Sequence, residues 1–548
     1  MNIKLNGKDL SFSKPTRIVD MFENDDYHFM AAKVNNRLRE LNYIVSNDCE
    51  ITLLDLNDAE VTKMYQATLR YVIAMAAKKI YPKARVSFNY SVSRSIFVTL
   101  SNLGHAFLQR NLDEIKEEIT NIISKDMPIE RFSLKKEEAI EYYNSIGWTD
   151  KVKILKYRPE DTVHVYQCDD FKDYMFGYML PKTGYLKNFV LKLYSPGFIV
   201  TYPRSELKGE IPPFQDERVF RSSLKEANVW GNVSKSAYIY QMNEIVERGD
   251  ALEFINTCEA RHNRQLCELG QKISENIDNI KLICVAGPSS SGKTTFTNRL
   301  RIELKMRGIE PLMISMDNFY KSTSEAPLDE NGKPDLEHID ALDLTLFDDC
   351  IFRLIQGEAV ALPEFNFTLG KRTFNEPIKL KNKQAIVIEG IHGLNDRICP
   401  SIADDQKFRI YIAPLSQYKI DDHNPISISD IRLIRRIVRD YQFRGTGCEK
   451  TLETWQSVRN GEFKWIYPYQ NNADYVYNSE LSYELCVMKK HAIPLLQEIP
   501  SDSPVFISAN RLIKFLKYFE NITDKWVPCN SILREFIGDS IFYTTDKK

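Results

Sequence analysis

Apolar residues between positions 281 and 500 alternate between two patterns. Short apolar runs with the length of buried strands occur at residues 282–286, 311–315, 384–389, 408–412 and 474–477. Longer amphipathic stretches separate them, and within one of these Phe296, Leu300 and Leu304 recur at helical spacing. Strands that alternate with helices predict a parallel α/β sheet with helices on both faces.

The sequence before position 226 follows other patterns. Residues 1–58 contain short alternating runs and one short helical segment, which predict a small β-grasp unit. Residues 59–225 predict an α+β unit. Its first helix covers residues 65–80 and ends before Pro82, because proline disfavours helix in the residue before it. A second helix is predicted with Ser133 as its cap.

Two further segments flank the predicted parallel sheet. Residues 226–280 form a helical connector, with one helix predicted over residues 245–266. Residues 501–548 form a helical tail with an amphipathic helix over residues 511–519. We expect this tail to pack back on a domain or on a second subunit.

Composition narrows the class of protein. Because one domain takes ~100–200 residues, a chain of 548 residues predicts about two to four domains. A net charge of −2 gives no overall attraction to nucleic acid. The ten cysteines are scattered, which indicates reduced thiols. No apolar run approaches the ~20 residues that a membrane span needs. We expect a soluble cytoplasmic protein without a membrane partner, and a homo-oligomer stays open.

A glycine-rich loop follows the first apolar run of the predicted sheet. Its two glycines frame four residues and precede Lys293, which is the spacing of a phosphate-binding loop. Such a loop turns backbone N–H groups toward the phosphates of ATP, and Lys293 can reach the β- and γ-phosphates. The Thr294 hydroxyl can coordinate Mg²⁺. The predicted ATP-binding residues are Gly287, Ser289, Ser290, Ser291, Gly292, Lys293, Thr294 and Thr295.

Two acidic residues lie at the ends of predicted strands. Asp317 follows the second strand and Glu389 ends the third. Ligands of such sheets bind beyond the carboxyl ends of the strands. Asp317 can therefore take a proton from a substrate hydroxyl, and Glu389 can hold Mg²⁺ directly or through water. The alternatives are a helix-capping or turn role for Asp317 and a buried structural role for Glu389.

An arginine-rich helix is predicted over residues 430–440, before a glycine-containing segment. The rigid donor fork of arginine suits phosphate oxygens, and a helix in this position is typical of a mobile lid that closes over ATP. We predict that Arg436, Arg439 and Arg444 act at the phosphates. The alternative is a solvated basic face.

These motifs occur in one order over residues 281–492, which resemble the uridine kinase and phosphoribulokinase family. The resemblance rests on the loop, the Asp-x-Phe-Tyr and Glu-Gly-Ile motifs and the arginine helix. It implies phosphorylation of a nucleoside 5′-hydroxyl by ATP. It also implies that Asp317 is the base, that Tyr320 lies in the substrate pocket and that Glu337 binds the ribose hydroxyls.

The predicted substrate pocket departs from the family pattern. Uridine–cytidine kinases have a tyrosine and a histidine for the base edge, where this sequence has Phe365 and Gly370. Phe365 and Phe367 can stack on a base, but a site without hydrogen-bond partners discriminates poorly between bases. Their alternative role is core packing. In addition, Glu337 replaces a shorter aspartate, and Thr446 replaces an arginine of the lid.

Residues 1–225 resemble the front of threonyl-tRNA synthetases, with a TGS domain followed by the editing-associated domain shared with alanyl-type synthetases. That family has an HxxxH pair and a later Cys and His, and the aligned positions fall on or near Ala67, Tyr71, Met175 and Met179. These four residues are not a usual zinc ligand set, so we predict no aminoacyl-tRNA editing. The whole arrangement resembles the bacterial TGS-containing nucleoside kinases.

Two other functions stay open. The phosphoryl acceptor could be another hydroxylated metabolite, such as a sugar phosphate. The protein could instead be an ATP-switched module whose residues 1–225 contact RNA or a partner, although a near-neutral charge argues against extensive contact with a phosphate backbone.

Overall fold

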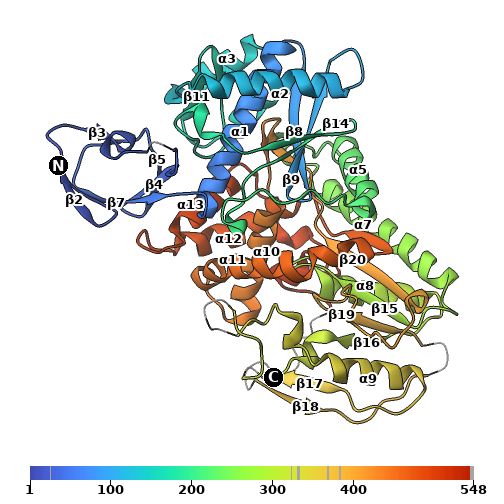
Figure 1. Cartoon of the computed structure of the whole chain (residues 1–548). Coiled ribbons are helices and arrows are strands. Elements are labelled where there is room, and N and C mark those ends of the chain that lie inside the picture. The colour runs from blue at the N-terminus through green and yellow to red at the C-terminus, as the bar shows by residue number, and fades with distance from the viewer. Residues whose placement is uncertain are drawn as a thin grey trace.

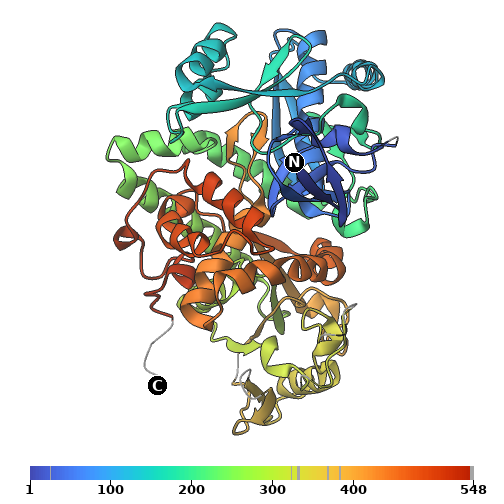
Figure 2. The same ribbon diagram turned by 90° about the vertical axis from the view of Figure 1, so that its left-hand side faces the viewer.

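The computed structural model describes residues 1–542 except positions 25, 323, 330, 331, 333, 367–369, 382 and 383. Figure 1 shows two halves, with the N-terminal elements (blue to blue-green) above the parallel sheet and its helices (green to red). Figure 2 shows the same division from the side of the N-terminal sheet. Among the described helices, none combines the length and apolarity that a membrane crossing requires.

The first unit is the predicted small mixed sheet. Its strands are ordered β2-β1-β7-β4-β5, and β1 runs parallel to β7 while β4 runs antiparallel to it. The bounds are β1 Asn2–Leu5, β2 Lys8–Ser11, β4 Ala31–Val34, β5 Arg37–Glu40 and β7 Cys49–Leu54. A two-stranded pair of β3 (Thr16–Arg17) and β6 (Ile44–Val45) and a 3-10 turn over Ile18–Met21 occupy the place of the predicted short helix.

The second unit surrounds a long buried helix, α1 (Ala59–Ile80), whose N-terminus is capped by the Asp58 side chain. The predicted cap at Ser133 is wrong, because Ser133 lies in a strand and its hydroxyl contacts the His164 ring at 2.9 Å. The remaining elements are β8 Arg85–Val92, β9 Ser95–Ser101, α2 Gln109–Ser124, β10 Glu130–Lys135, α3 Lys136–Ser145, α4 Thr149–Leu155, β11 Thr162–Cys168, β12 Phe171–Asp173, β13 Val190–Tyr194 and β14 Gly197–Thr201.

The connector consists of α5 (Arg218–Val233), α6 (Ile239–Glu247) and α7 (Ala251–Glu275). The single helix predicted over residues 245–266 is wrong, because the chain turns at Gly249, which has a φ of +84°. A left-handed glycine ends a helix readily, since it has no Cβ to clash.

The second half contains the predicted parallel α/β sheet, and this prediction is confirmed. Its order is β16-β19-β15-β20-β23, and every described pair in it is parallel. The strands are β15 Leu282–Ala286, β16 Leu312–Ser315, β19 Ile386–Glu389, β20 Lys407–Ala413 and β23 Tyr475–Asn478.

Helices cover both faces of this sheet because successive side chains of a strand point to opposite sides. Ile283 and Val285 join the core formed with α7, α8 (Lys293–Met306) and the C-terminal helices. Leu282 and Cys284 join a separate core with α9 (Leu344–Ile355). The helices are α8 Lys293–Met306, α9 Leu344–Ile355, α10 Ile428–Arg444, α11 Cys448–Trp465, α12 Glu484–Gln497, α13 Phe506–Leu516 and α14 Arg534–Ile537.

A small hairpin joins the two halves. Its strands, β21 (Lys419–Asp421) and β22 (Asn424–Pro425), follow β20 of the parallel sheet in the chain. The hairpin contacts the N-terminal half, where the amide of Phe88 in β8 donates to the Asp422 carbonyl at 2.8 Å. Lys151 of α4 is fully buried between Asp173 (2.8 Å) and Asp421 (3.1 Å). One ammonium therefore holds carboxylates from both halves.

Replacing this lysine tests the junction. Lys151→Met removes the ammonium that the two buried carboxylates share, so we expect the free energy of unfolding to fall by about 3–5 kcal/mol. Lys153→Met on the same helix is the matched control. It removes a partly exposed pair with Glu244 (3.3 Å), which contributes about 0–1 kcal/mol. Urea denaturation of both variants measures the difference, and equal losses would contradict the role given to Lys151.

Candidate active site

The phosphate-binding loop joins β15 to α8 at the carboxyl edge of the parallel sheet. Gly292 is left-handed, with a φ of +91°, and a Cβ on Gly287 would lie 2.1 Å from the Ile412 carbonyl oxygen. Both positions therefore require glycine. The Lys293 ammonium donates to the carbonyl oxygens of Gly287 (2.9 Å) and Pro288 (3.3 Å), so its side chain folds back across the loop.

The loop carries polar atoms that lack a partner. The hydroxyls of Ser290, Ser291 and Thr295 are buried and make no hydrogen bond to the described residues. Such atoms cost free energy unless a ligand or water satisfies them. Thr294, the proposed Mg²⁺ ligand, is partly exposed in the first turn of α8. These residues fit the phosphate groups of ATP with Mg²⁺.

The two predicted carboxylates lie beside the loop because three strands end together. Glu389 is in register with Ser315 of β16 and with Val285 of β15. Asp317 follows in a 3-10 turn over Met316–Phe319, and its side chain is exposed rather than packed into the interior.

Charges in this cluster shift one another's pKa. Burial lowers the pKa of the Lys293 ammonium, and Glu389 and Asp317 oppose this shift. Loss of hydration beside the neighbouring protein groups raises the pKa of Asp317, and the charges of Lys293, Arg444 and Arg439 oppose this shift. Burial, followed by repulsion from Asp317, raises the pKa of Glu389 to about 7. Lys293, Asp317 and Glu389 thus form one electrostatic unit.

The predicted phosphate-binding arginines all pair with one acid, Asp440, which was not predicted as a site residue. Asp440 of α10 pairs with Arg439 (2.7 Å), Arg436 (3.2 Å) and Arg444 (3.7 Å). Arg436 also donates to the Ser289 hydroxyl at 3.1 Å. Gly445, with a φ of +59°, ends the helix after Arg444. The three guanidinium groups are therefore grouped at the loop.

Two other arginines fix α10 against the loop. Arg432 is buried with Glu462, and its Nε donates to the Ser289 carbonyl at 3.0 Å. Arg435 is buried with Glu484 (2.5 Å) and lies 3.4 Å from the Ser290 carbonyl oxygen. The spacing of the arginines does not predict these partners, which come from α11 and α12.

The predicted acceptor pocket is brought together only in part. The Tyr320 hydroxyl donates to the Leu336 carbonyl at 3.0 Å, and its ring lies 6.0 Å from the Phe365 ring. Burial, followed by the charge of Glu462, raises the pKa of Glu337 to about 7. Phe367 lies outside the described residues.

Two residues that were not predicted complete the wall around Glu337. A Cβ on Gly461 of α11 would lie 2.5 Å from the Glu337 Cβ, so only glycine permits this close approach. His392, three residues after Glu389, is buried, and burial followed by the charge of His338 lowers its pKa to about 3. His392 is therefore neutral at physiological pH.

The positions aligned with synthetase zinc ligands belong to the core of the N-terminal half. Ala67, Tyr71, Met175 and Met179 are all buried, and the Tyr71 hydroxyl donates to the Phe171 carbonyl at 2.7 Å. Within the part of the chain that the structure describes, no three His, Cys, Asp or Glu side chains form a cluster that could hold a metal. The ten cysteines are free thiols.

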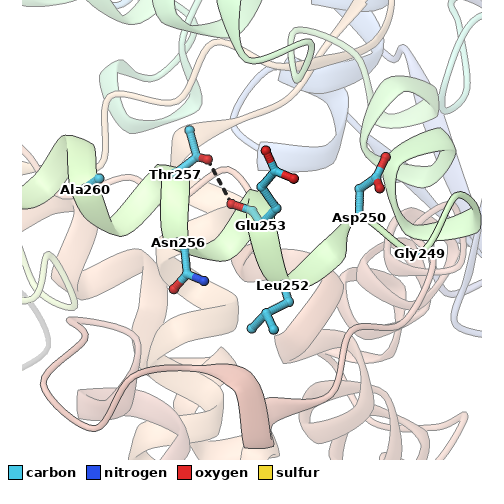
Figure 3. A pocket seen from close by; sticks show the side chains of 7 residues that line it. All are labelled: Gly249, Asp250, Leu252, Glu253, Asn256, Thr257 and Ala260. Atoms are coloured by element: carbon cyan, nitrogen blue, oxygen red, sulfur yellow. Dashed lines mark hydrogen bonds between the residues drawn. The ribbon is translucent and has the colours of Figure 1, made fainter.

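A hollow of about 620 Å³ lies away from this cluster, at the start of α7 (Figure 3). It is lined by residues from one helix and the turn before it, and the Thr257 hydroxyl donates to the Glu253 carbonyl at 2.8 Å. Side chains from a single helical face do not converge on one point, so we place the active site at the loop instead.

The region that contains the phosphate-binding loop is similar to a family of known proteins. Residues 282–482 match the phosphoribulokinase/uridine kinase family model. The C-terminal half contains a phosphoribulokinase/uridine kinase domain. This match supports a P-loop phosphotransferase in that half of the chain.

The N-terminal region is similar to threonine–tRNA ligases. It is 31% identical over 163 residues to the ligase of Acetivibrio thermocellus and 32% identical over 167 residues to that of Desulforamulus reducens. Each match covers 30% of this chain and 26% of the ligase. The chain therefore spans about a quarter of the length of these curated relatives.

Two solved structures are also similar to the chain. One is a candidate fructose transport system kinase from Silicibacter (19% identity, TM-score 0.30, 39% of this chain and 98% of that chain). The other is a candidate uridine kinase from Bacillus stearothermophilus (18% identity, TM-score 0.23, 36% of this chain and 88% of that chain).

The raised pKa of Glu389 predicts a pH-dependent stability. Its pKa is about 7 in the fold and 4.5 in the reference state, so folding favours the protonated carboxyl. This contribution is complete below pH 4.5 and is lost as the pH rises through 7. We therefore expect Glu389→Gln to stabilise the metal-free protein by about 3 kcal/mol at pH 8 and far less at pH 5.

Chemical denaturation between pH 5 and pH 8.5 measures this gap. Glu364→Gln, an exposed position on β17 (Pro363–Asn366), serves as the control, for which we expect no pH-dependent gap. A gap for Glu389→Gln that shrinks as the pH rises would contradict the electrostatic account.

Proposed function

We propose that the kinase domain transfers the γ-phosphoryl group of ATP to the 5′-hydroxyl of a nucleoside. The observation that carries this proposal is the solvent-exposed carboxylate of Asp317 in the same charge cluster as Lys293, beside the phosphate-binding loop. A base for an attacking hydroxyl must face an open space next to the transferred phosphoryl group. The exposure of Asp317 supports this role.

Each group then has one task. The loop amides and Lys293 hold the triphosphate, while Thr294 and Glu389 would hold Mg²⁺, which neutralises phosphate charge when bound. Asp317 takes the hydroxyl proton as the hydroxyl oxygen bonds to the γ-phosphorus. The bond from that phosphorus to the β–γ bridging oxygen breaks, and ADP leaves. Arg436, Arg439 and Arg444, which pair with Asp440, stabilise the negative charge on the transferred phosphoryl group.

A nucleoside suits the wall opposite the loop. The rings of Tyr320 and Phe365 offer apolar surface for a base, and the Glu337 carboxyl can accept hydrogen bonds from ribose hydroxyls. A sugar phosphate or similar metabolite is the second candidate. It is favoured by Phe365 and Gly370, which have no side-chain donor or acceptor to select a base.

Replacing the proposed base tests the reaction. Asp317→Asn keeps the side-chain shape but cannot take a proton, so we expect kcat to fall by about 10²–10⁴ with ATP binding retained. Asp349→Asn, an exposed acid on α9 paired with Arg353 at 3.4 Å, is the matched control and should keep full activity. Formation of ADP and of nucleoside 5′-monophosphate measures the effect across a panel of nucleosides.

The same panel separates the candidates. Turnover of a metabolite extract but of no nucleoside would favour the sugar-phosphate acceptor. ATP-dependent RNA binding that survives in Asp317→Asn, without turnover of any acceptor, would favour the switched binding module. Full activity of Asp317→Asn with any acceptor would contradict the proposed mechanism.

A further inference from the structure

The C-terminal tail packs directly on the phosphate-binding loop. Ile532, Leu533 and Phe536 are fully buried in the core that one face of the parallel sheet forms with α7, α8 and the C-terminal helices. The Phe536 ring centroid lies 5.1 Å from the Arg435 guanidinium carbon, on the helix that crosses the loop. Arg534 holds the segment folded, since it donates to the Asp524 and Val527 carbonyl oxygens at 2.8 Å each.

One contact places a negative charge where a phosphate is expected. The backbone amide of Thr295, the third residue of α8, donates to the Glu535 carboxylate at 2.9 Å. Amides in the first turn of this 14-residue helix are the donors that a phosphate-binding loop offers to its nucleotide. The Glu535 charge also acts on Lys293 and Glu389, so the carboxylate lies within the active-site cluster.

The backbone of the phosphate-binding loop lies in close contact with the tail residues around Ile532. A Cβ on Gly292 would lie 2.5 Å from the Ile532 Cγ2, so the tail approaches the loop backbone as closely as glycine allows. At the same place, the buried hydroxyls of Ser290, Ser291 and Thr295 lack partners among the described residues, although Glu535 satisfies the neighbouring amide. The tail therefore fills part of a site that is built for a larger polar ligand.

We propose that Glu535 is an internal anionic ligand of the phosphate-binding loop and that a nucleoside triphosphate must displace it to bind. This inference rests on the proposed use of ATP at the loop. Two anions cannot share the Thr295 amide, and Asp317 and Glu389 already add negative charge nearby. The tail thus restrains nucleotide entry, because the apparent affinity for ATP equals the intrinsic affinity multiplied by the fraction of molecules in which Glu535 has left the loop.

Titration of the full chain with ATP tests this inference. Glu535→Gln keeps the shape of the side chain but loses its charge, and a neutral acceptor is weaker than a charged one. We expect Kd for ATP to fall roughly fivefold or more. Asp539→Asn, four residues further along and pointing into solvent, is the matched control and should leave Kd unchanged. Equal or weaker ATP binding by Glu535→Gln would overturn the inference.

Two further measurements distinguish failure of this inference from a folding defect and from failure of the proposed function. Glu535→Asp keeps the charge but is too short to reach the amide, so it should also tighten ATP binding. Hydrogen exchange in the wild type should rise at residues 531–538 when ATP saturates the protein, and unchanged exchange there would count against displacement. If the wild type binds and turns over ATP while Glu535→Gln matches it, the inference fails and the kinase assignment stands. If no variant binds ATP, both fail.

Discussion

The geometry of the phosphate-binding loop constrains the rest of the kinase half. Its backbone must pass within contact distance of the Ile412 carbonyl at Gly287 and turn through a left-handed conformation at Gly292. Those two requirements aim the first amides of α8 outward from the end of β15. The neighbouring strands then deliver Asp317 and Glu389 to the same edge, because parallel strands end together.

Charge balance around Lys293 explains how the surrounding elements are arranged. Asp317, Glu389 and Glu535 act on a single ammonium, so the cluster favours bound cations and opposes further anions. The helix α10 supplies the compensating charge, and buried pairs with Glu462 and Glu484 hold that helix in place. A buried pair of this kind is costly to break, so Arg432 and Arg435 hold their part of α10 against the loop.

The sequence predicts the parts of the site that are local in the chain. The apolar run before the loop, its glycine spacing and the acids after two strands are sufficient to place β15, α8, Asp317 and Glu389. Contacts between distant segments could not be predicted, since nothing near Thr295 indicates a partner 240 residues later. The same holds for the hairpin that buries Asp421 in the other half. Local propensity also failed at Ser133, where pairing of β10 with β11 overrides a good capping residue.

The most direct test of the central claim is a crystal structure of the full chain with a non-hydrolysable ATP analogue and Mg²⁺. The account predicts that the phosphates accept hydrogen bonds from the amides of residues 290–295, that Asp317 faces the γ-phosphate across open space, and that Glu535 has left the Thr295 amide. An analogue bound elsewhere, or an Asp317 carboxylate turned away from the γ-phosphate into packed interior, would contradict it.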